Sequence, residues 1–285
     1  MERVAIITDS ISCLTREHVE QYGIGIVPLN FFFRGKVYKD WVDITPTEAY
    51  ELFLKDPDSF KTSTGSPGDW LEAYREANKQ ATDIVCVTLS SKISAVYSVA
   101  QQAREQVKAE LPHLSIEVVD SQTVTAAEGF VALAAARAAE GGKSLAEVVR
   151  VAKEMRERVT FLGLLDTIRH VYRTGRIPKV ASQIGAMLNI KPILTTSSGL
   201  IHFTGAVRSR ESGVKRLLRI MRDKVGQKPV HVAVMHAYAL DEAKRLKEKV
   251  AAEFDCAELW LTEFSPVMGY ACGTGTLGLA FYAGN

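Results

Sequence analysis

The segment DIVCVTL, from Asp83 to Leu89, indicates the fold class of this 285-residue chain. Four apolar residues follow one another in it, so both faces of a strand formed here would be buried. The segment VHVAVM, from Val230 to Met235, has the same character. Strands that are apolar on both faces are typical of parallel sheets covered by helices on either side.

Such strands alternate with helical patterns along the chain, which predicts an α/β fold. Helices are expected after Thr45, Ser66 and Ser144, because each is followed three positions later by a Glu or Asp that can complete a capping box. The expected strands are Val4–Thr8, Gly25–Phe33, Ile84–Thr88, Ile116–Val119, Thr160–Leu165, Lys191–Thr196, Val230–Met235 and Leu259–Phe264.

The length of the chain is sufficient for two domains. The helical pattern of Ser144–Arg158 leads directly into the strand VTFLGLL, with no Pro/Gly linker between them. We therefore expect an N-terminal α/β domain of residues 1–158, with a mostly parallel sheet, and a C-terminal α/β domain of residues 159–285.

Composition excludes several classes of protein. The net charge of +2 comes from interleaved acidic and basic residues, whereas nucleic-acid binding usually requires a concentrated basic face. We expect no membrane span, because no run approaches the roughly 18 apolar residues that one needs, and no secretory signal. The four cysteines are widely scattered, as in reduced cytosolic proteins. A soluble cytoplasmic protein is expected.

Sequence motifs for catalysis are missing. The chain contains no GxSxG nucleophile elbow, and its six histidines lack metal-ligand spacing, so we expect no metal and no cofactor. Asp9, Asp120 and His236 follow predicted strands and leave open a hydrolase or phosphotransferase at these loops. A protein-interaction module with an incidental cavity is a third hypothesis.

Loops rich in small hydroxyl residues follow four strand candidates in the first half. They are Thr8–Ser10, Lys61–Ser66, Thr88–Ser94 and Asp120–Ser121. Ligands of open α/β sheets bind beyond the carboxyl ends of the strands, where hydroxyls and free backbone N–H groups suit an anion. Each Ser or Thr would equally well cap its own helix. Four such loops in one half favour a shared polar site.

Several blocks of sequence, taken in order, resemble those of the DegV family. They are VAIITDSISCL, KTSTGSPGDW, VTLSSKISAVYSVA, VVDSQTVTAAEG, DTIRHVYRTGRI, IGAMLNIKPIL, GAVRSRESGVKRL and MGYACGTGTLGLAF, which together extend over nearly the whole chain. The resemblance implies a two-domain α/β fold that buries a long-chain fatty acid, such as palmitate or oleate, between or within its domains. It also implies a carrier without catalytic activity, which presents the acyl carboxylate to the catalytic subunit of a fatty acid kinase.

By this resemblance, Thr62 and Ser94 hydrogen-bond the carboxylate, and Ser63 and Ser91 are neighbours in the same network. The resemblance also assigns Arg173 and Arg176, in a Tyr-Arg-Thr-Gly-Arg turn, to docking of the kinase, although solvated loop charges would give the same pattern. The carrier is expected to make at most transient contact with membranes. An apolar tunnel is expected to be lined by Phe31, Phe33, Ile93, Ile184, Met187, Leu188 and Met268, all of which would also suit an ordinary core.

The last block departs from the family pattern. Where the family commonly has His within Gly-Thr-His-x-Gly-Pro-Gly, this chain has Ala271. One carboxylate donor is therefore missing or is supplied by another group, for which Tyr270 and Cys272 are the candidates.

Overall fold

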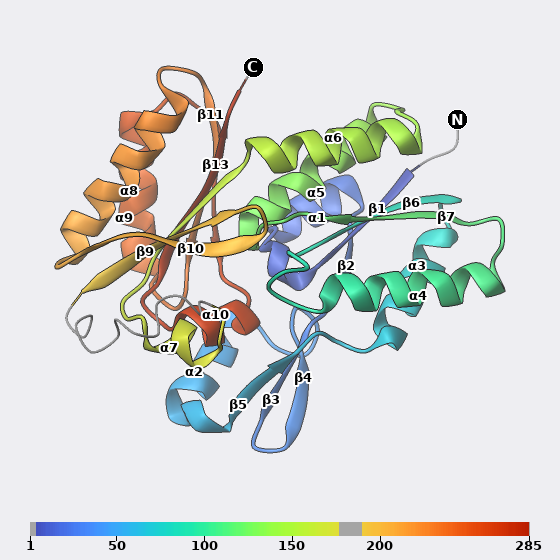
Figure 1. Ribbon diagram of the computed structural model, residues 1–285, viewed down its shortest axis with the longest axis horizontal. Helices are drawn as coiled ribbons and strands as arrows, with labels where there is room; N and C mark the ends of the chain where they lie inside the picture. The colour runs from blue at the N-terminus through green and yellow to red at the C-terminus, as the bar shows by residue number, and fades with distance from the viewer. Residues whose placement is uncertain (1–3, 177–189, 285) are drawn as a thin grey trace.

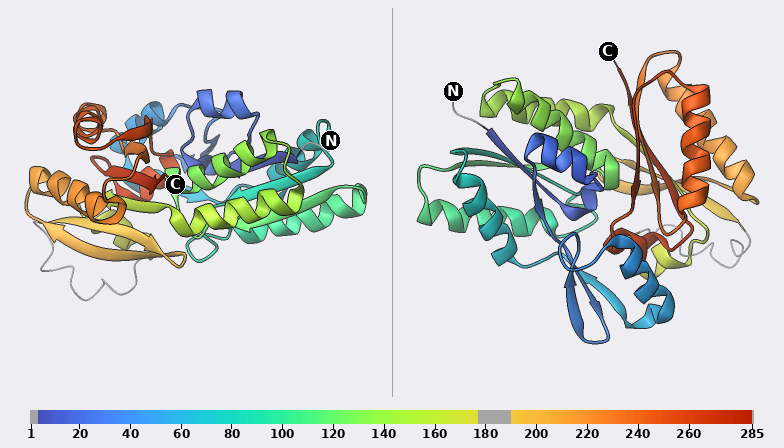
Figure 2. Two further views of the ribbon diagram at one scale, coloured as in Figure 1. Left: turned by 90° about the horizontal axis from the view of Figure 1, so that it is seen from above. Right: turned by 180° about the vertical axis from the view of Figure 1, so that it is seen from behind.

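A computed structural model describes residues 4–176 and 190–284 of the chain. Within these ranges the strands form a four-stranded sheet, a six-stranded sheet and a small three-stranded sheet. Figure 1 shows the two larger sheets beside each other, with the small sheet below them. The two views of Figure 2 show the same arrangement from above and from behind. This confirms the predicted α/β fold.

The four-stranded sheet is parallel throughout, as expected for the first half. Helices α3 and α4 cover one face and α5 and α6 the other, with α1 beside α5 (Figure 1). The strands, in sheet order, are β2 (Gly25–Val27), β1 (Val4–Asp9), β6 (Asp83–Thr88) and β7 (Ser115–Asp120). The helices are α1 (Arg16–Tyr22), α3 (Pro67–Asn78), α4 (Val96–Glu110), α5 (Thr125–Glu140) and α6 (Leu145–Arg158).

The predicted strand Gly25–Phe33 is wrong as one element. It is two strands in different sheets, because Pro28 has no N–H to continue the ladder that β2 begins. The second piece, β3, pairs with β4 and β5 in the small antiparallel sheet. This sheet and its helices comprise β4 (Lys36–Lys39), β3 (Asn30–Phe33), β5 (Phe60–Ser63), α2 (Pro46–Lys55) and the short turn η2 (Pro57–Ser59).

The six-stranded sheet is mixed. Within it, β11 pairs in parallel with β12 and antiparallel with β13. The continuous apolar pattern of VHVAVM thus reports burial on both faces, but not parallel neighbours on both sides. In sheet order the strands are β10 (Leu200–Val207), β9 (Lys191–Ser197), β8 (Thr160–Leu164), β13 (Leu277–Ala283), β11 (Val230–His236) and β12 (Cys256–Glu263). The sequence did not predict β4, β5, β10 or β13.

Helix α5 lies between the two larger sheets. It contacts β1 and β6 of the first sheet and β8 and β13 of the second. Its residues are buried on nearly every side, as expected for a helix that is apolar all round. The outer face of the six-stranded sheet is covered by α8 (Arg210–Val225) and α9 (Leu240–Glu253).

Two short helices complete the middle of the molecule. They are α7 (Arg169–Arg173) and α10 (Pro266–Cys272), and they contact each other. Helix α10 also packs on α2, β3 and β5 of the first half. The expected domain boundary falls between the end of α6 at Arg158 and the start of β8 at Thr160. The division itself stays a prediction.

Candidate functional site

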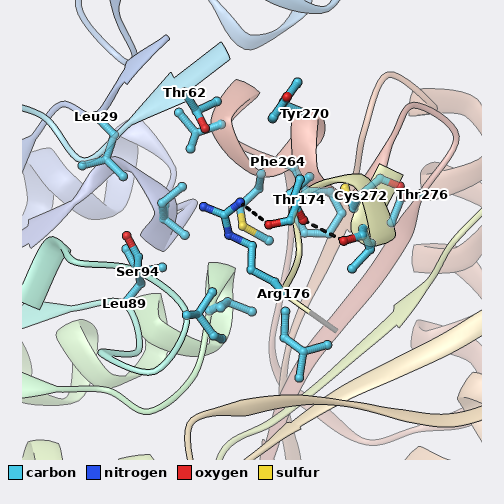
Figure 3. Close-up of a pocket in the computed structure, with 18 of the residues that line it drawn as sticks. Leu29, Thr62, Leu89, Ser94, Thr174, Arg176, Phe264, Tyr270, Cys272 and Thr276 are labelled. Carbon is cyan, nitrogen blue, oxygen red and sulfur yellow. Dashed lines mark hydrogen bonds between the residues drawn. The ribbon is translucent and has the colours of Figure 1, made fainter. Parts of the chain in front are cut away.

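An apolar pocket lies where the loops after β1, β6 and β7 meet the six-stranded sheet and helices α7 and α10. About 990 Å³ of empty space lies between its walls, including the part that opens to solvent. Figure 3 shows the side chains that surround it. Both halves of the chain therefore contribute to one site.

The walls of the pocket are largely aliphatic and aromatic. The first half supplies residues from the strand-end loops, and the second half supplies residues from β8, β9, β10 and α10. Such walls, combined with a few polar groups, are typical of sites for small apolar ligands. The apolar residues include Ile11, Leu29, Leu89, Ile93, Val124, Phe161, Leu165, Leu194, Ile201, Phe264, Val267 and Met268.

Three of the four predicted carboxylate-binding residues line this pocket: Thr62, Ser63 and Ser94. Thr62 and Ser63 end strand β5, and their hydroxyls make no hydrogen bond within the described part of the chain. Ser94 precedes helix α4, and its Oγ accepts a hydrogen bond from the backbone N–H of Val96 at 3.4 Å. The Ser94 O–H is left free to donate. All three hydroxyls can therefore donate to a ligand.

Ser91 lies outside the pocket. Its Oγ donates to Oδ2 of Asp120 at 2.5 Å, and its backbone N–H donates to Oδ1 of the same carboxylate at 3.2 Å. The Asp120 carboxylate thus fixes the start of the loop and engages the Ser91 hydroxyl. The sequence could not separate these two serines, because both stand in one hydroxyl-rich loop.

Arg176 lines the pocket, whereas the family resemblance assigned it to docking of the kinase. Its guanidinium points toward the side where Leu29, Thr62 and Ser94 lie (Figure 3). Nη1 donates to the carbonyl of Thr174 at 3.1 Å, which directs the side chain. Among the described lining residues, Arg176 carries the one charged group. The pocket therefore combines unengaged hydroxyls with a positive charge, which suits an anionic head group.

Arg173 has different surroundings. Its guanidinium lies 4.9 Å from the centre of the Tyr270 ring and 3.6 Å from Oδ1 of the exposed Asp58. Unlike Arg176, it does not line the pocket. The two arginines of the Tyr-Arg-Thr-Gly-Arg turn thus face in different directions.

Two predicted tunnel residues, Ile93 and Met268, line the pocket. Phe31 and Phe33 do not, because strand β3 directs them into the core of the small sheet, where Phe31 stacks on Phe60 with ring centres 4.7 Å apart. Ile184, Met187 and Leu188 lie outside the described residues. The sequence did not predict wall residues such as Phe161 and Leu194, because the apolar residues of their strands would suit an ordinary core equally well.

Helix α10 brings Tyr270, Ala271 and Cys272 to the pocket. Ala271 is therefore at the site, where the resembling family has His. Burial raises the pKa of the Cys272 thiol to about 12, so this thiol remains neutral. The Tyr270 ring stacks on Phe60, with centres 5.7 Å apart. The Cys272 thiol is bonded to the carbonyl of Gly273 at 3.7 Å, whereas the Tyr270 hydroxyl makes no hydrogen bond within the described residues.

Asp9 and His236 are engaged structurally, and neither lines the pocket. Oδ1 and Oδ2 of Asp9 accept backbone hydrogen bonds from Ile11 at 2.9 Å and Leu89 at 3.0 Å, and burial raises the Asp9 pKa to about 6. Nδ1 of His236 accepts a hydrogen bond from the N–H of Ala239 at 3.3 Å, and burial lowers the His236 pKa to about 4. With Asp120 bonded to Ser91, none of the three candidate catalytic residues is directed at the pocket.

None of the helices in residues 4–176 and 190–284 has the length and apolar character to cross a bilayer. The same residues contain no cluster of three or more His, Cys, Asp or Glu that would suit a metal ion.

The chain resembles known proteins over nearly its whole length. A family model described as "Uncharacterised protein, DegV family" matches residues 3–284. The chain is 30% identical to a DegV domain-containing protein of Clostridium acetobutylicum, and the match covers 99% of each chain.

Solved structures give the same result. One is DegV of Bacillus subtilis, described as a fatty acid binding protein, with a TM-score of 0.91, 27% identity and full coverage of both chains. Another is a stearic acid-binding protein of Eubacterium ventriosum, with a TM-score of 0.89, 25% identity and coverage of 99% of this chain and 98% of that one. The match to the family model, which extends over nearly every residue, shows that this chain belongs to the DegV family.

Proposed function

We propose that this chain is a cytoplasmic carrier that binds one long-chain fatty acid, such as palmitate or oleate, and presents its carboxylate to a partner kinase. The observation that carries the proposal is the composition of one pocket: apolar walls, together with the hydroxyls of Thr62, Ser63 and Ser94 and the guanidinium of Arg176. The relatives described as fatty acid binding proteins support the same ligand class.

The polar groups suit a carboxylate. Hydrogen bonds to a charged acceptor are roughly twice as strong as those between neutral groups. The hydroxyls of Thr62 and Ser63 are unengaged among the described residues, so they can donate to a ligand without first breaking a hydrogen bond within the protein. Arg176 supplies a counter-charge on the described wall of the pocket. We therefore assign the carboxylate to the space between these groups.

The apolar walls suit an acyl chain. Each buried CH₂ contributes about 0.8 kcal/mol, so a long tail offers on the order of 10 kcal/mol before the cost of ordering it. The tail would then dominate affinity, and the head-group contacts would set orientation. Thr62 and Ser94 are half-buried, so a carboxylate held between them would remain accessible to a second protein.

The partner kinase is a more specific proposal than the fatty acid ligand. It is supported by the family resemblance and by the exposed position of Arg173, whose side chain is 37% exposed beside Asp58. A cation at this place suits an acidic partner surface. The wide scatter of the four cysteines along the sequence supports a cytoplasmic location.

Native mass spectrometry of freshly purified protein tests the proposed ligand. We expect an added mass equal to one fatty acid of C14–C18 length, which denaturation releases. Added palmitate or oleate should also raise the melting temperature of protein that has been stripped of lipid. Protein that is empty in every preparation and gains no stability from either acid would contradict the proposal.

The head-group site is tested by replacing Thr62 and Ser94 with Ala together. We expect the dissociation constant for oleate to rise at least tenfold, since each lost charged hydrogen bond is worth about 1.5–3 kcal/mol. Ser91→Ala is the matched control from the same loop, and its affinity should be unchanged because its hydroxyl is bonded to Asp120. An unchanged affinity in the double variant would remove the proposed carboxylate site.

A further inference from the structure

The hairpin of β9 and β10 forms part of the pocket wall. Leu194 of β9 and Ile201 of β10 both line it, and β10 is the edge strand of its sheet. The two strands are joined by a two-residue turn, Ser198–Gly199, with φ values of 48° and 80°. These values belong to the tight turn that hairpins favour, which requires positive φ at both positions. The hairpin extends toward the first sheet in Figure 1.

The tip of this hairpin is fastened to the first half of the chain. Ser90 Oγ donates to the Gly199 carbonyl at 2.6 Å, and Lys92 Nζ donates to the Ser198 carbonyl at 2.8 Å. We call these four residues the clasp. Two positions before the turn, Thr196 Oγ1 lies 2.8 Å from Thr123 Oγ1 in the loop after β7. The attachment is thus made by a few polar contacts.

Ser90 connects the clasp to the proposed head-group site. It is fully buried, and its carbonyl accepts hydrogen bonds from the backbone N–H groups of Ile93 at 3.0 Å and Ser94 at 3.1 Å. Its own N–H donates to the Thr123 carbonyl at 3.0 Å. One residue therefore holds the Ser94 turn, the β7 loop and the hairpin tip together.

Strand β9 is paired with β8 from Ile193 to Thr195, so the loosely attached part of the hairpin is the tip beyond Thr195. Strand β10 is mostly exposed along its length. Its pairing with β9 is interrupted between Phe203 and Gly205, and a Cβ at Gly205 would meet no atom within 4 Å. Segments with exposed backbone hydrogen bonds and little packing open at low free energy. Release of the clasp would therefore free the tip, from Thr196 to Ile201, to move away from the first half of the chain.

We infer that Ser90 couples the head-group loop to the tip of the β9–β10 hairpin, and that opening of the clasp governs the rate at which the acyl ligand enters and leaves. The inference rests on the proposed function. It makes Ser90 a positioning residue, because Ser90 acts on the ligand through Ser94 and through the hairpin tip that carries Ile201.

A pair of glycine substitutions tests the clasp. In Gly199→Ala, the new Cβ would lie 2.8 Å from Ser90 Oγ and would force the tip away. Gly35→Ala is the matched control: Arg34–Gly35 joins β3 and β4 with the same φ values of 48° and 80°, but a Cβ there meets nothing within 4 Å. The strain of a positive φ is the same in both variants, so their difference isolates the clasp.

Ligand exchange is measured by loading each protein with the fluorescent fatty acid cis-parinaric acid and mixing it with excess oleate. Gly199→Ala should release the probe about tenfold faster than Gly35→Ala, as expected when about one hydrogen bond is lost from the closed state. Equal rates would overturn the inference while leaving the proposed function intact. A wild-type protein that takes up neither fatty acid would overturn both.

A cross-link gives the converse test in folded protein. Thr123→Cys combined with Thr196→Cys places two thiols where the threonine oxygens are 2.8 Å apart. Oxidation should slow probe release at least tenfold, and a reductant should restore the original rate. Exchange that is as fast in the cross-linked protein as in the reduced one would contradict a gate at this hairpin.

Discussion

Arg173 and Arg176 are three residues apart, yet their guanidinium groups have different partners. Arg173 lies over the Tyr270 ring and near Asp58. Arg176 extends into the pocket, where Thr174 accepts one of its hydrogen bonds (Figure 3). A guanidinium that faces an apolar pocket is positioned for a carboxylate, whereas one at the surface is positioned for a partner protein. The two residues are therefore assigned different roles.

This assignment predicts separate effects of Arg176→Gln and Arg173→Gln. Arg176→Gln should weaken oleate binding about tenfold by removing a charged hydrogen bond, and should not change binding of the uncharged oleyl alcohol. Arg173→Gln should leave oleate affinity unchanged and should reduce formation of acyl phosphate when the kinase and ATP are added. Hydroxylamine trapping measures the acyl phosphate. Equal effects of both substitutions on oleate affinity would contradict the assignment.

Helix α5, which lies between the two larger sheets, requires a glycine at position 129. Its start is close to the segment before α1: an added Cβ on Gly129 would lie 2.5 Å from the Ser12 carbonyl oxygen and 3.0 Å from Leu14 Cδ2. Real Cβ atoms do not approach a backbone oxygen so closely. The glycine is thus needed for packing, although glycine usually weakens the interior of a helix.

We therefore predict opposite signs for one substitution in two helices. Gly129→Ala should lower the free energy of unfolding by about 1–3 kcal/mol, since the overpacked helix must move. Gly68→Ala, in the exposed first turn of α3, should raise it by up to about 1 kcal/mol, because the new Cβ meets only Ser66 Oγ at 3.5 Å. Urea unfolding of both variants measures the difference. A stabilising Gly129→Ala would show that the close approach is relieved without cost.

At the scale of the whole molecule, Glu258 of strand β12 connects the two halves. Its carboxylate accepts from Arg137 of α5 at 2.8 Å, contacts Nδ1 of His231 at 2.8 Å and lies 3.5 Å from Nε2 of His18 in α1. Burial alone would raise the Glu258 pKa. The hydrogen bonds from His18, Arg137 and His231 outweigh burial and hold the pKa at about 2.

The sign of the resulting pH dependence follows from this lowered pKa. Ionised Glu258 stabilises the folded state fully above its ordinary pKa of 4.5, and the contribution is lost as the pH falls from 4.5 toward 2. Its size is about 3 kcal/mol at neutral pH. Glu258→Gln should lose this amount at pH 7 and converge on the wild type near pH 2. Glu248→Gln, on the exposed face of α9, is the control and should change little.

The stability of Glu258→Gln must be compared with that of the wild type at each pH, because the buried carboxyls of Asp9 and Asp40 change the stability with pH in the opposite direction. Burial raises the pKa of both carboxyls to about 6, so each disfavours the folded state increasingly as the pH rises from 3.8 to 6. Their effect is common to the wild type and to Glu258→Gln, and it cancels in the difference. A Glu258→Gln variant with the same pH profile as the wild type would contradict the bridging role.

The sequence alone determined the local features of this protein. Capping boxes at Thr45, Ser66 and Ser144 lie where the sequence predicts them, since each is complete within four residues. Apolar runs such as DIVCVTL identified buried strands, because a run of apolar residues is also a property of adjacent positions in the chain. The ordered motifs identified the family. Periodicity and capping depend on neighbours in the chain, so a sequence read without coordinates can predict them.

Only the tertiary structure decided which of these residues share a site. Ser91 and Ser94 are alike in sequence, but Asp120 engages Ser91, and Ser94 is left facing the pocket. Phe31 and Phe161 are both apolar strand residues, yet Phe161 alone lines the pocket. The direction of a side chain depends on contacts between segments more than 100 residues apart, as in Ser90 and Gly199. No local pattern encodes such contacts.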